Sequence, residues 1–453
     1  MTSPPVPHDG LPENERGLAI TAMLMAVAMA SLDTAIVNTA LPTIARELGA
    51  DAPSAVYAIT SYQLAMVAMI LPLASVGDAL GHRRVYMVGL GLFTAASLLC
   101  GLAWSLPTLI VARVLQGLGA AAIMSVNGAM VRFIYPARML GRGVGLNAFA
   151  VGLAFTAGPT IASGILSFTT WHWLFLINVP IGIVAVVIGL RTLPDPEASG
   201  RRIEFIPSAL CAGFFAFLVL AIGSITHQAD WLKISIELVV SFACLIALVR
   251  IQRGHPAPVL SVDLFKLPVF ALSAVTAVCA FATQGLAFVA LPFLFQMELV
   301  RSQVDTGFLI TPWPAMVAIM APIAGRLSDR YPVGILGGAG LVMLSIGMGS
   351  LAFMSSTPTT FDICCRMALS GIGFGFFQSP NLRALISSAP PGRAGSASGI
   401  VGTARLLGQT LGAALVALCL LVSTEHGAIV ALWLGCGFAA FGSVMSFLRL
   451  VAK

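Results

Sequence analysis

Charged side chains are scarce in this sequence. Asp, Glu, Lys and Arg make up only 9% of its 453 residues, whereas an average soluble domain carries roughly 25%. Hydrophobic residues make up 58%, and the mean hydropathy is +0.96. This composition predicts an all-α, polytopic membrane protein, because so few polar residues cannot cover a soluble fold. The net charge of +6 is spread along the chain and gives no indication of nucleic-acid binding.

Several kinds of chemical site are missing as well. None of the eight cysteines forms a Cys-x-x-Cys pair, so neither a metal site nor a disulfide framework is indicated. All six histidines are expected in loops, which argues against a histidine proton relay inside the membrane. An intramembrane enzyme would need histidine, paired acids or a serine with a base within the spans, and we see none. We therefore expect neither an enzyme nor a bound cofactor, and the short loops leave no soluble output domain for a receptor.

Apolar runs of about 20 residues recur along the whole chain, each long enough to cross a bilayer. They predict about 14 membrane helices joined by short loops. The expected spans are 17–41, 55–76, 85–104, 107–131, 142–168, 173–191, 205–225, 232–251, 268–296, 306–327, 333–354, 360–382, 395–422 and 427–448.

Lys and Arg are unevenly divided between the two sides of these spans. Of the 24 such residues, only Arg46, Lys233 and Arg301 fall on the side opposite the N-terminus, and Arg113, Arg366 and Arg405 fall within spans. Because positive residues concentrate in cytoplasmic loops, we expect both termini to lie in the cytoplasm.

The chain also repeats itself. Charged residues recur at matching places: Asp78 with Arg84 and Asp329 with Arg330 in loops, and Arg113 and Arg366 in spans. Two parallel six-helix halves with an added helix pair are the architecture of a rocking transporter. We therefore divide the chain into an N-terminal bundle (1–195), a linker with two extra membrane helices (196–262) and a C-terminal bundle (263–453).

Four sequence motifs lie in order along these spans. The segment 32–42 reads LDTAIVNTALP, Asp78, Gly81, Arg83 and Arg84 follow the second span, 171–182 reads WHWLFLINVPIG, and 405–412 reads RLLGQTLG. From about residue 17 to 449 the chain resembles the major facilitator superfamily, and within it the fourteen-helix drug–proton antiporter family.

The resemblance implies the major facilitator fold and proton-coupled export of amphipathic, cationic drugs or toxic compounds by alternating access. The location would be a bacterial inner membrane, and the energy source a proton gradient without a cofactor. The expected partners are a small-molecule substrate, protons and membrane lipids, with no nucleic acid, and the expected state is a monomer. The alternative is a proton-coupled carrier of one endogenous metabolite or lipid-like compound, and residues alone do not discriminate between the two.

Asp33 is the candidate proton-binding residue. It lies inside the first predicted span, where a carboxylate must face a bundle interior or a wet cavity. Desolvation favours the neutral carboxyl and a nearby cation favours the charged one, so a change of surroundings can load and release a proton. Arg113 is its best basic counterpart, and the resemblance ties it to proton transfer. The alternatives are a packing role for Asp33 and a structural role for Arg113.

A second set of residues is expected to form a cytoplasmic gate. It comprises Asp78, Gly81, Arg83, Arg84, Asp329 and Arg330. A carboxylate such as Asp78 can rest on the positive end of a helix, and the start of the thirteenth span near Gly395 is its expected target. The alternative is a tight turn whose arginines only set topology.

The fifth predicted span is rich in small residues around Gly158 and Pro159, which resemble an antiporter helix motif. Small residues let helices pack backbone to backbone, and a proline bends a helix. Ordinary packing is the alternative.

Polar and aromatic residues within spans are candidates for a substrate cavity, because aromatic faces suit lipophilic cations. The candidates are Tyr62, Gln63, Gln116, Phe149, Phe155, Phe281, Gln284, Phe288, Trp313, Phe377, Gln378, Asn381 and Arg405. The charge of Arg405 would instead favour anionic groups, so the substrate's charge stays open.

Overall fold

The computed structural model describes residues 10–136, 139–195, 204–224, 231–253, 259–355, 357–388, 394–423 and 426–451, and the regular structure in these ranges is entirely helical. The elements are α1 (Glu13–Glu47), α2 (Ala52–Ala55), α3 (Tyr57–Leu80), α4 (His82–Gly101), α5 (Leu106–Ile134), α6 (Leu140–Phe168), α7 (Trp173–Leu176), α8 (Asn178–Thr192), α9 (Phe205–Ser224), α10 (Trp231–Ile251), η2 (Val262–Lys266), α11 (Pro268–Phe293), η3 (Leu294–Glu298), α12 (Gln303–Ile310), α13 (Pro312–Leu327), α14 (Val333–Ala352), α15 (Thr360–Ser388), α16 (Ala394–Val422) and α17 (Gly427–Leu448).

Within the described residues, thirteen helical segments are long and apolar enough to cross a membrane, and α9 contributes a shorter apolar helix, Phe205–Ala221. The predicted all-helical class is therefore confirmed. Some predicted single spans consist of two consecutive elements, such as α2 with α3 and α12 with α13. Two details were wrong. His82 is the first residue of α4 and does not lie in a loop, and Asp78 and Arg84 lie within α3 and α4, on either side of the turn at Gly81.

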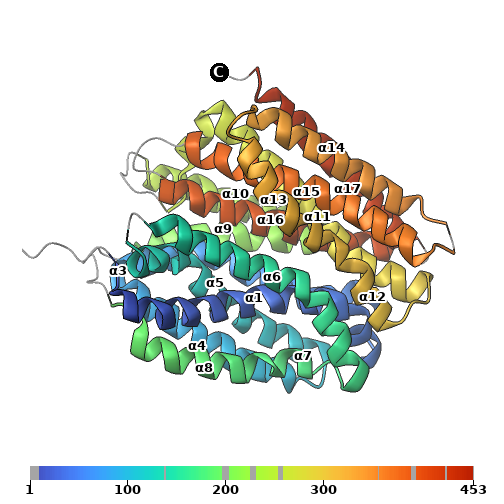
Figure 1. Ribbon diagram of the computed structural model, residues 1–453, viewed down its shortest axis with the longest axis horizontal. Helices are drawn as coiled ribbons and strands as arrows, with labels where there is room; N and C mark the ends of the chain where they lie inside the picture. Colours follow the sequence, from blue (N-terminus) through green and yellow to red (C-terminus); the bar gives the residue numbers. More distant parts are fainter. Residues whose placement is uncertain are drawn as a thin grey trace, which may run out of the picture.

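The packing of the helices repeats between the two halves of the chain. In the first half α1 packs against α6 and α8, while α5 packs against α3 and α4. In the second half α11 packs against α16 and α17, while α15 packs against α13 and α14. Figure 1 shows the two halves as separate layers, blue to green below and orange to red above. The repeat predicted from the charged residues is thus a repeat of helix packing, although the domain boundaries stay a prediction.

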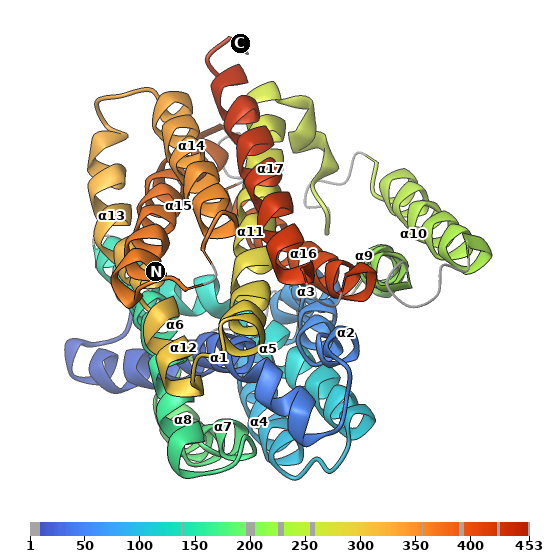
Figure 2. The ribbon, with the colours of Figure 1, turned by 90° about the vertical axis from the view of Figure 1, so that its right-hand side faces the viewer.

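The helix pair between the halves lies at the side of the molecule. The two helices α9 and α10 pack against each other, and α9 also contacts α3 and α16. Figure 2 shows α10 at the periphery, with α9 between it and α3. The pair therefore adds to both halves without entering the space between them.

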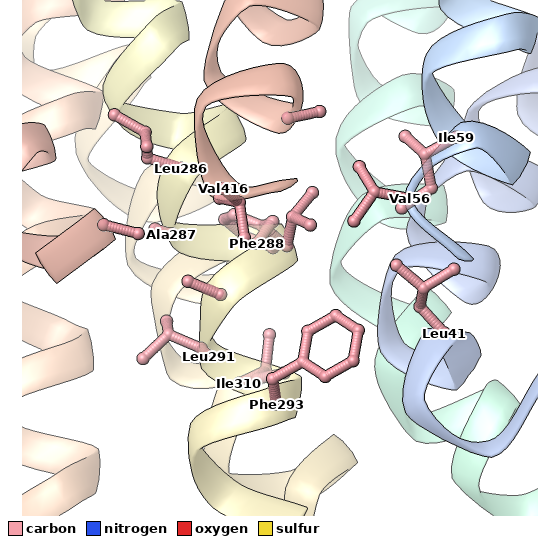
Figure 3. Close-up of a cluster of buried hydrophobic side chains, with 14 of the residues drawn as sticks. Leu41, Val56, Ile59, Leu286, Ala287, Phe288, Leu291, Phe293, Ile310 and Val416 are labelled. Atoms are coloured by element: carbon pink, nitrogen blue, oxygen red, sulfur yellow. The ribbon is translucent and has the colours of Figure 1, made fainter. Parts of the chain in front are cut away.

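The halves are sealed against each other at one end. We call the end where α1 begins the near end, and the end where α1 finishes at Glu47 the far end. Leu41 in α1 belongs to one buried apolar cluster with Leu291 and Phe293 in α11. Figure 3 shows Phe293 reaching from α11 toward Leu41. Burying a large apolar side chain contributes about 1.5–3 kcal/mol, so these contacts hold the far end closed.

Hydrogen bonds between the halves support the same seal. Gln303 Nε2 donates to Thr43 Oγ1 at 2.7 Å, and Ser163 Oγ donates to the Gln303 carbonyl at 2.7 Å. The Thr160 and Thr311 hydroxyls lie 2.9 Å apart. These groups are uncharged, so separating them leaves no unpaired ion. The structure is therefore closed at the far end by contacts that can open at modest cost.

Candidate functional site

Asp33 lies at the centre of a buried polar cluster in the first half. The residue is 1% exposed. Its Oδ2 accepts a hydrogen bond from Arg113 Nη1 at 2.5 Å, while Oδ1 accepts from Gln116 Nε2 at 2.8 Å and from Asn178 Nδ2 at 3.2 Å. These donors lie on α5 and α8, which pack on α1. The carboxylate thus faces the interior of its half, and an ion pair with two further donors compensates its burial.

Arg113 contacts α3 as well as Asp33 of α1. Its Nε donates to the carbonyl of Ala58 in α3 at 2.9 Å, and its guanidinium lies 4.1 Å from the centre of the Tyr62 ring. A capping box between Ser105 and Thr108 fixes where α5 begins, and Arg113 follows two turns later on the face toward α3. The cluster therefore links α1, α3, α5 and α8 through one ion pair.

A glycine permits this close approach of α3 and α5. A Cβ atom at Gly117 would lie 2.4 Å from the carbonyl oxygen of Tyr62. The preceding residue, Gln116, extends the cluster to α4, because its Nε2 also donates to Ser97 Oγ at 2.9 Å. Tyr62 and Gln116, both predicted as cavity residues, thus belong to the surroundings of Asp33.

A separate pocket lies between the two halves. It is narrow and partly open to solvent. Helices α1, α3 and α6 of the first half and α11 and α16 of the second form its walls. The lining residues are Thr34, Asn38, Gln63, Phe155, Gln284, Gly285, Phe288, Val289 and Gln409. Thr34 follows Asp33 directly in α1, so the same helix carries the buried carboxylate and one wall of the pocket.

Four of the predicted cavity residues line this pocket, namely Gln63, Phe155, Gln284 and Phe288. Several others do not. Phe281, Phe377 and Trp313 are buried in the apolar cluster, Phe281 contacting Phe377 and Trp313 contacting Phe288. Phe149 is 67% exposed on the outside, as an apolar side chain in a membrane protein can be.

Three polar candidates also lie away from the pocket walls. Asn381 accepts a hydrogen bond from Arg449 at 2.8 Å and is structural at the near end. Gln378 is half-buried in α15. Arg405 is half-buried in α16, interacts electrostatically with Tyr62, and makes no hydrogen bond or ion pair with any described residue.

The first part of the predicted gate forms contacts within its own half. Gly81 ends α3 at φ 102°, a backbone conformation that favours glycine. Arg83 donates to the carbonyl of Leu190 at 2.5 Å and lies 3.5 Å from Asp195, so it ties α4 to the end of α8. Asp78 lies 3.1 Å from the imidazole of His82.

The expected partner of Asp78 is the start of α16 near Gly395. This start directly follows residues 389–393, which lie outside the described residues, so the gate between halves stays a prediction. Arg84 is exposed. In the second half Asp329 pairs with Arg383 of α15, and Arg330 is exposed.

Gly158 and Pro159 lie where α6 is squeezed between α1 and the second half. A Cβ atom at Gly158 would lie 2.4 Å from Cβ of Ala35 in α1. On the other side, a Cβ atom at Gly307 of α12 would lie 2.4 Å from the carbonyl oxygen of Pro159. The predicted close packing therefore lies directly beside the far-end seal.

Comparison with known proteins identifies the family. A model described as Major Facilitator Superfamily matches residues 23–413. The chain belongs to this superfamily. It is thus a multi-pass membrane transporter, as the resemblance in the sequence implied.

Named relatives of this superfamily member differ in their described roles. The chain is 45% identical to the uncharacterized transporter YebQ of Escherichia coli (strain K12), over 99% of this chain and 98% of the relative. It is 28% identical to the riboflavin transporter RibZ of Clostridioides difficile (strain 630), over 88% and 87%. It is 30% identical to the multidrug resistance protein Stp of Mycobacterium tuberculosis (strain CDC 1551 / Oshkosh), over 92% and 76%.

The two halves of this superfamily member share packing but differ in charge. Arg366 occupies the place in α15 that Arg113 has in α5. It pairs with Asp362 of its own helix at 2.9 Å, and both side chains are partly exposed. The buried pair between helices thus occurs in the first half only, among the described residues.

Sequence reasoning missed residues on both sites. Asn178 completes the coordination of Asp33, and its place in the WHWLFLINVPIG segment was the available signal. Asn38 and Gln409 line the pocket. Asn38 lies within the segment 32–42 and Gln409 within 405–412, so two of the four motifs that carry the family resemblance supply pocket walls.

Proposed function

We propose that this chain is a proton-coupled exporter of amphipathic compounds, in which Asp33 binds and releases the coupling proton. One observation carries the proposal: Asp33 is an enclosed carboxylate paired to Arg113 at 2.5 Å inside a transporter half. An ionisable residue within a membrane span is by default a functional residue, because burying it is costly.

The proposed coupling uses the link between the cluster and the pocket. Protonation of Asp33 removes its attraction to Arg113, while Arg113 keeps its bond to the Ala58 carbonyl. The cluster joins α1 to α3, α5 and α8, so losing the ion pair loosens α1 against its neighbours. Because α1 also carries Thr34 and Asn38 of the pocket, a change at Asp33 reaches the substrate wall directly.

The enclosure of Asp33 defines the order of events. In the present conformation the carboxylate has no exposed surface, so its proton exchanges only after α1 and α5 have moved apart. The far end is closed here, and the pocket is partly open. We place the near end in the cytoplasm and the protein in a bacterial inner membrane, as the distribution of Lys and Arg favours. The working unit we propose is a monomer, with substrate, protons and lipid as its partners.

The test is resistance and transport in Asp33→Asn. Cells that express the wild-type chain should survive higher concentrations of several chemically different compounds from a panel of amphipathic antimicrobials. Asp33→Asn should abolish this protection and the pH-driven efflux of the same compounds from proteoliposomes, compared at equal amounts of folded protein. Asp362→Asn, in a partly exposed pair, is the control and should transport normally. Full efflux by Asp33→Asn would remove Asp33 from the mechanism.

A second candidate is a carrier dedicated to one endogenous compound. It is favoured by the number of hydrogen-bonding amides around the pocket, which suits one defined ligand better than a range of lipophilic drugs. The same panel distinguishes the two, because a dedicated carrier would protect against one compound class or none.

A further inference from the structure

Amide side chains dominate the polar lining of the pocket between the halves. Asn38 and Gln63 come from the first half, and Gln284 and Gln409 from the second. Gln409 Nε2 donates to Gln284 Oε1 at 3.0 Å. An amide offers both donors and acceptors and carries no charge. The pocket can therefore recognise a polar ligand without an ion pair.

Two of these amides lack partners. Asn38 Oδ1 and Gln63 Oε1 are buried and accept no hydrogen bond, and the two residues are 7% and 3% exposed. Neither side chain bonds to any described residue. A buried acceptor without a partner is unfavourable. A ligand that donates N–H or O–H groups to these oxygens therefore gains binding energy that a ligand without donors does not gain.

The charge around the pocket excludes a cation. The lining contains no acidic residue among those that the structure describes. The adjacent carboxylate, Asp33, is already neutralised by Arg113, and Arg405 adds an unpaired positive charge beside Tyr62. A cation entering here would lose its hydration and find no opposite charge.

The aromatic walls add a shape requirement. Phe155 and Phe288 contribute flat apolar surface from opposite halves. A flat ring system can stack on such surfaces.

We infer that the pocket binds an uncharged, planar heteroaromatic compound with N–H donors, through Asn38 and Gln63, and not a lipophilic cation. This inference rests on the proposed transport function and names its substrate class. It replaces the cationic drug expected from the sequence.

The test compares three flat tricyclic probes of similar size. Lumiflavin is uncharged and carries an imide N–H, 3-methyllumiflavin lacks that N–H, and proflavine is a cation. Binding to the purified full-length protein in detergent is measured by quenching of probe fluorescence, without a pH gradient. Lumiflavin should bind, and 3-methyllumiflavin should bind roughly tenfold to hundredfold more weakly, because one buried hydrogen bond is lost. Proflavine should bind more weakly than lumiflavin.

Variants tie the effect to the two amides. Asn38→Leu and Gln63→Met keep the approximate size of each side chain and remove an unpartnered acceptor, so both should fold. Because lumiflavin carries one imide N–H, the variant that loses the acceptor of this bond should bind lumiflavin roughly tenfold to hundredfold more weakly. Asn147→Leu removes an amide that, among the described residues, bonds only Asn127, away from the pocket. This variant should bind lumiflavin like wild type. Gln63→Glu adds a charge and should strengthen proflavine binding at least tenfold.

Three results would overturn the inference: no binding of lumiflavin, proflavine binding as tightly as lumiflavin, or lumiflavin binding unchanged in Asn38→Leu and Gln63→Met. Because these measurements use no proton gradient, they are independent of Asp33-driven export. Loss of pH-driven transport with intact lumiflavin selectivity would contradict only the export mechanism, and the reverse would contradict only the substrate class.

Discussion

Neutralising Asp33 leaves Arg113 as a buried cation without an ionic partner. Arg113 is 1% exposed, and Asp33 is its one ion-pair partner among the described residues. Removing one member of a buried pair costs about 3–5 kcal/mol, because the remaining charge is uncompensated. We therefore expect Asp33→Asn and Arg113→Gln each to lower the free energy of unfolding by an amount of that order.

The double variant should be less destabilised than the sum of the two single variants. With both charges gone, no buried ion remains, and the introduced amides can bond to Gln116, Asn178 and the Ala58 carbonyl. We expect a coupling energy of about 2–3 kcal/mol, at the upper end for residues in contact. The measurement is unfolding by SDS in mixed micelles, followed by tryptophan fluorescence for wild type, both single variants and the double.

The second half supplies the matched control. The cycle of Asp362→Asn and Arg366→Gln removes an ion pair within one helix, with side chains 38% and 25% exposed. Such pairs contribute about 0.3–0.5 kcal/mol, so this cycle should show a coupling near that value. If the Asp33 and Arg113 variants were additive within about 0.5 kcal/mol, the buried pair would not contribute to the folded state as described.

Three further variants test the packing around the site. Gly158→Ala should destabilise the protein by about 1–3 kcal/mol, since its Cβ would lie 2.4 Å from that of Ala35. The control Gly145→Ala adds a Cβ that meets nothing within 4 Å and should be tolerated. Equal thermal stability of the two variants would contradict the close packing at Gly158. Phe293→Ala should lower the stability of the conformation that is closed at the far end by about 3–5 kcal/mol. Distances between spin labels on the far-end loops of the two halves should then report a larger open population. An unchanged distance distribution would argue against the seal. Gly81→Ala forces a side chain onto φ 102° and should lower stability by about 1 kcal/mol, whereas a gain would show that the turn is not strained.

The fold was largely predictable because membrane spans carry a strong signal. A buried helix must be apolar over about 20 residues, so 13 of the spans could be placed from hydropathy alone. The repeated charges Asp78 and Asp329 located the two halves. The interruption of spans was not predictable, because α2 and α12 are each set off from the next helix by a single residue, Val56 and Thr311.

Site residues were predictable where their type is rare within membrane spans, as charged residues are, and unpredictable where their type is common there, as aromatic residues are. Asp33 and Arg113 stood out because charges within spans are costly, and the structure brings them together. Aromatic residues gave no such signal. Phe149 and Phe288 look alike in sequence, yet one is 67% exposed and the other lines the pocket, because helix rotation is decided by packing between helices.

Amides were an intermediate case. Gln63 and Gln284 were expected in the cavity, whereas Asn38 and Gln409 were not, although all four line it. An uncharged amide tolerates burial with few partners, so its position in a span does not show which way it faces. Only the arrangement of both halves brings the four together.

Infrared difference spectroscopy of the protein in liposomes tests most directly whether Asp33 takes up a proton within the bundle. On acidification the wild type should develop the carbonyl stretch of a protonated, buried carboxyl group, and Asp33→Asn should lack that band while Asp362→Asn retains it. If Asp33→Asn gave the same band as wild type, the proton would bind elsewhere and Asp33 would not be the coupling residue.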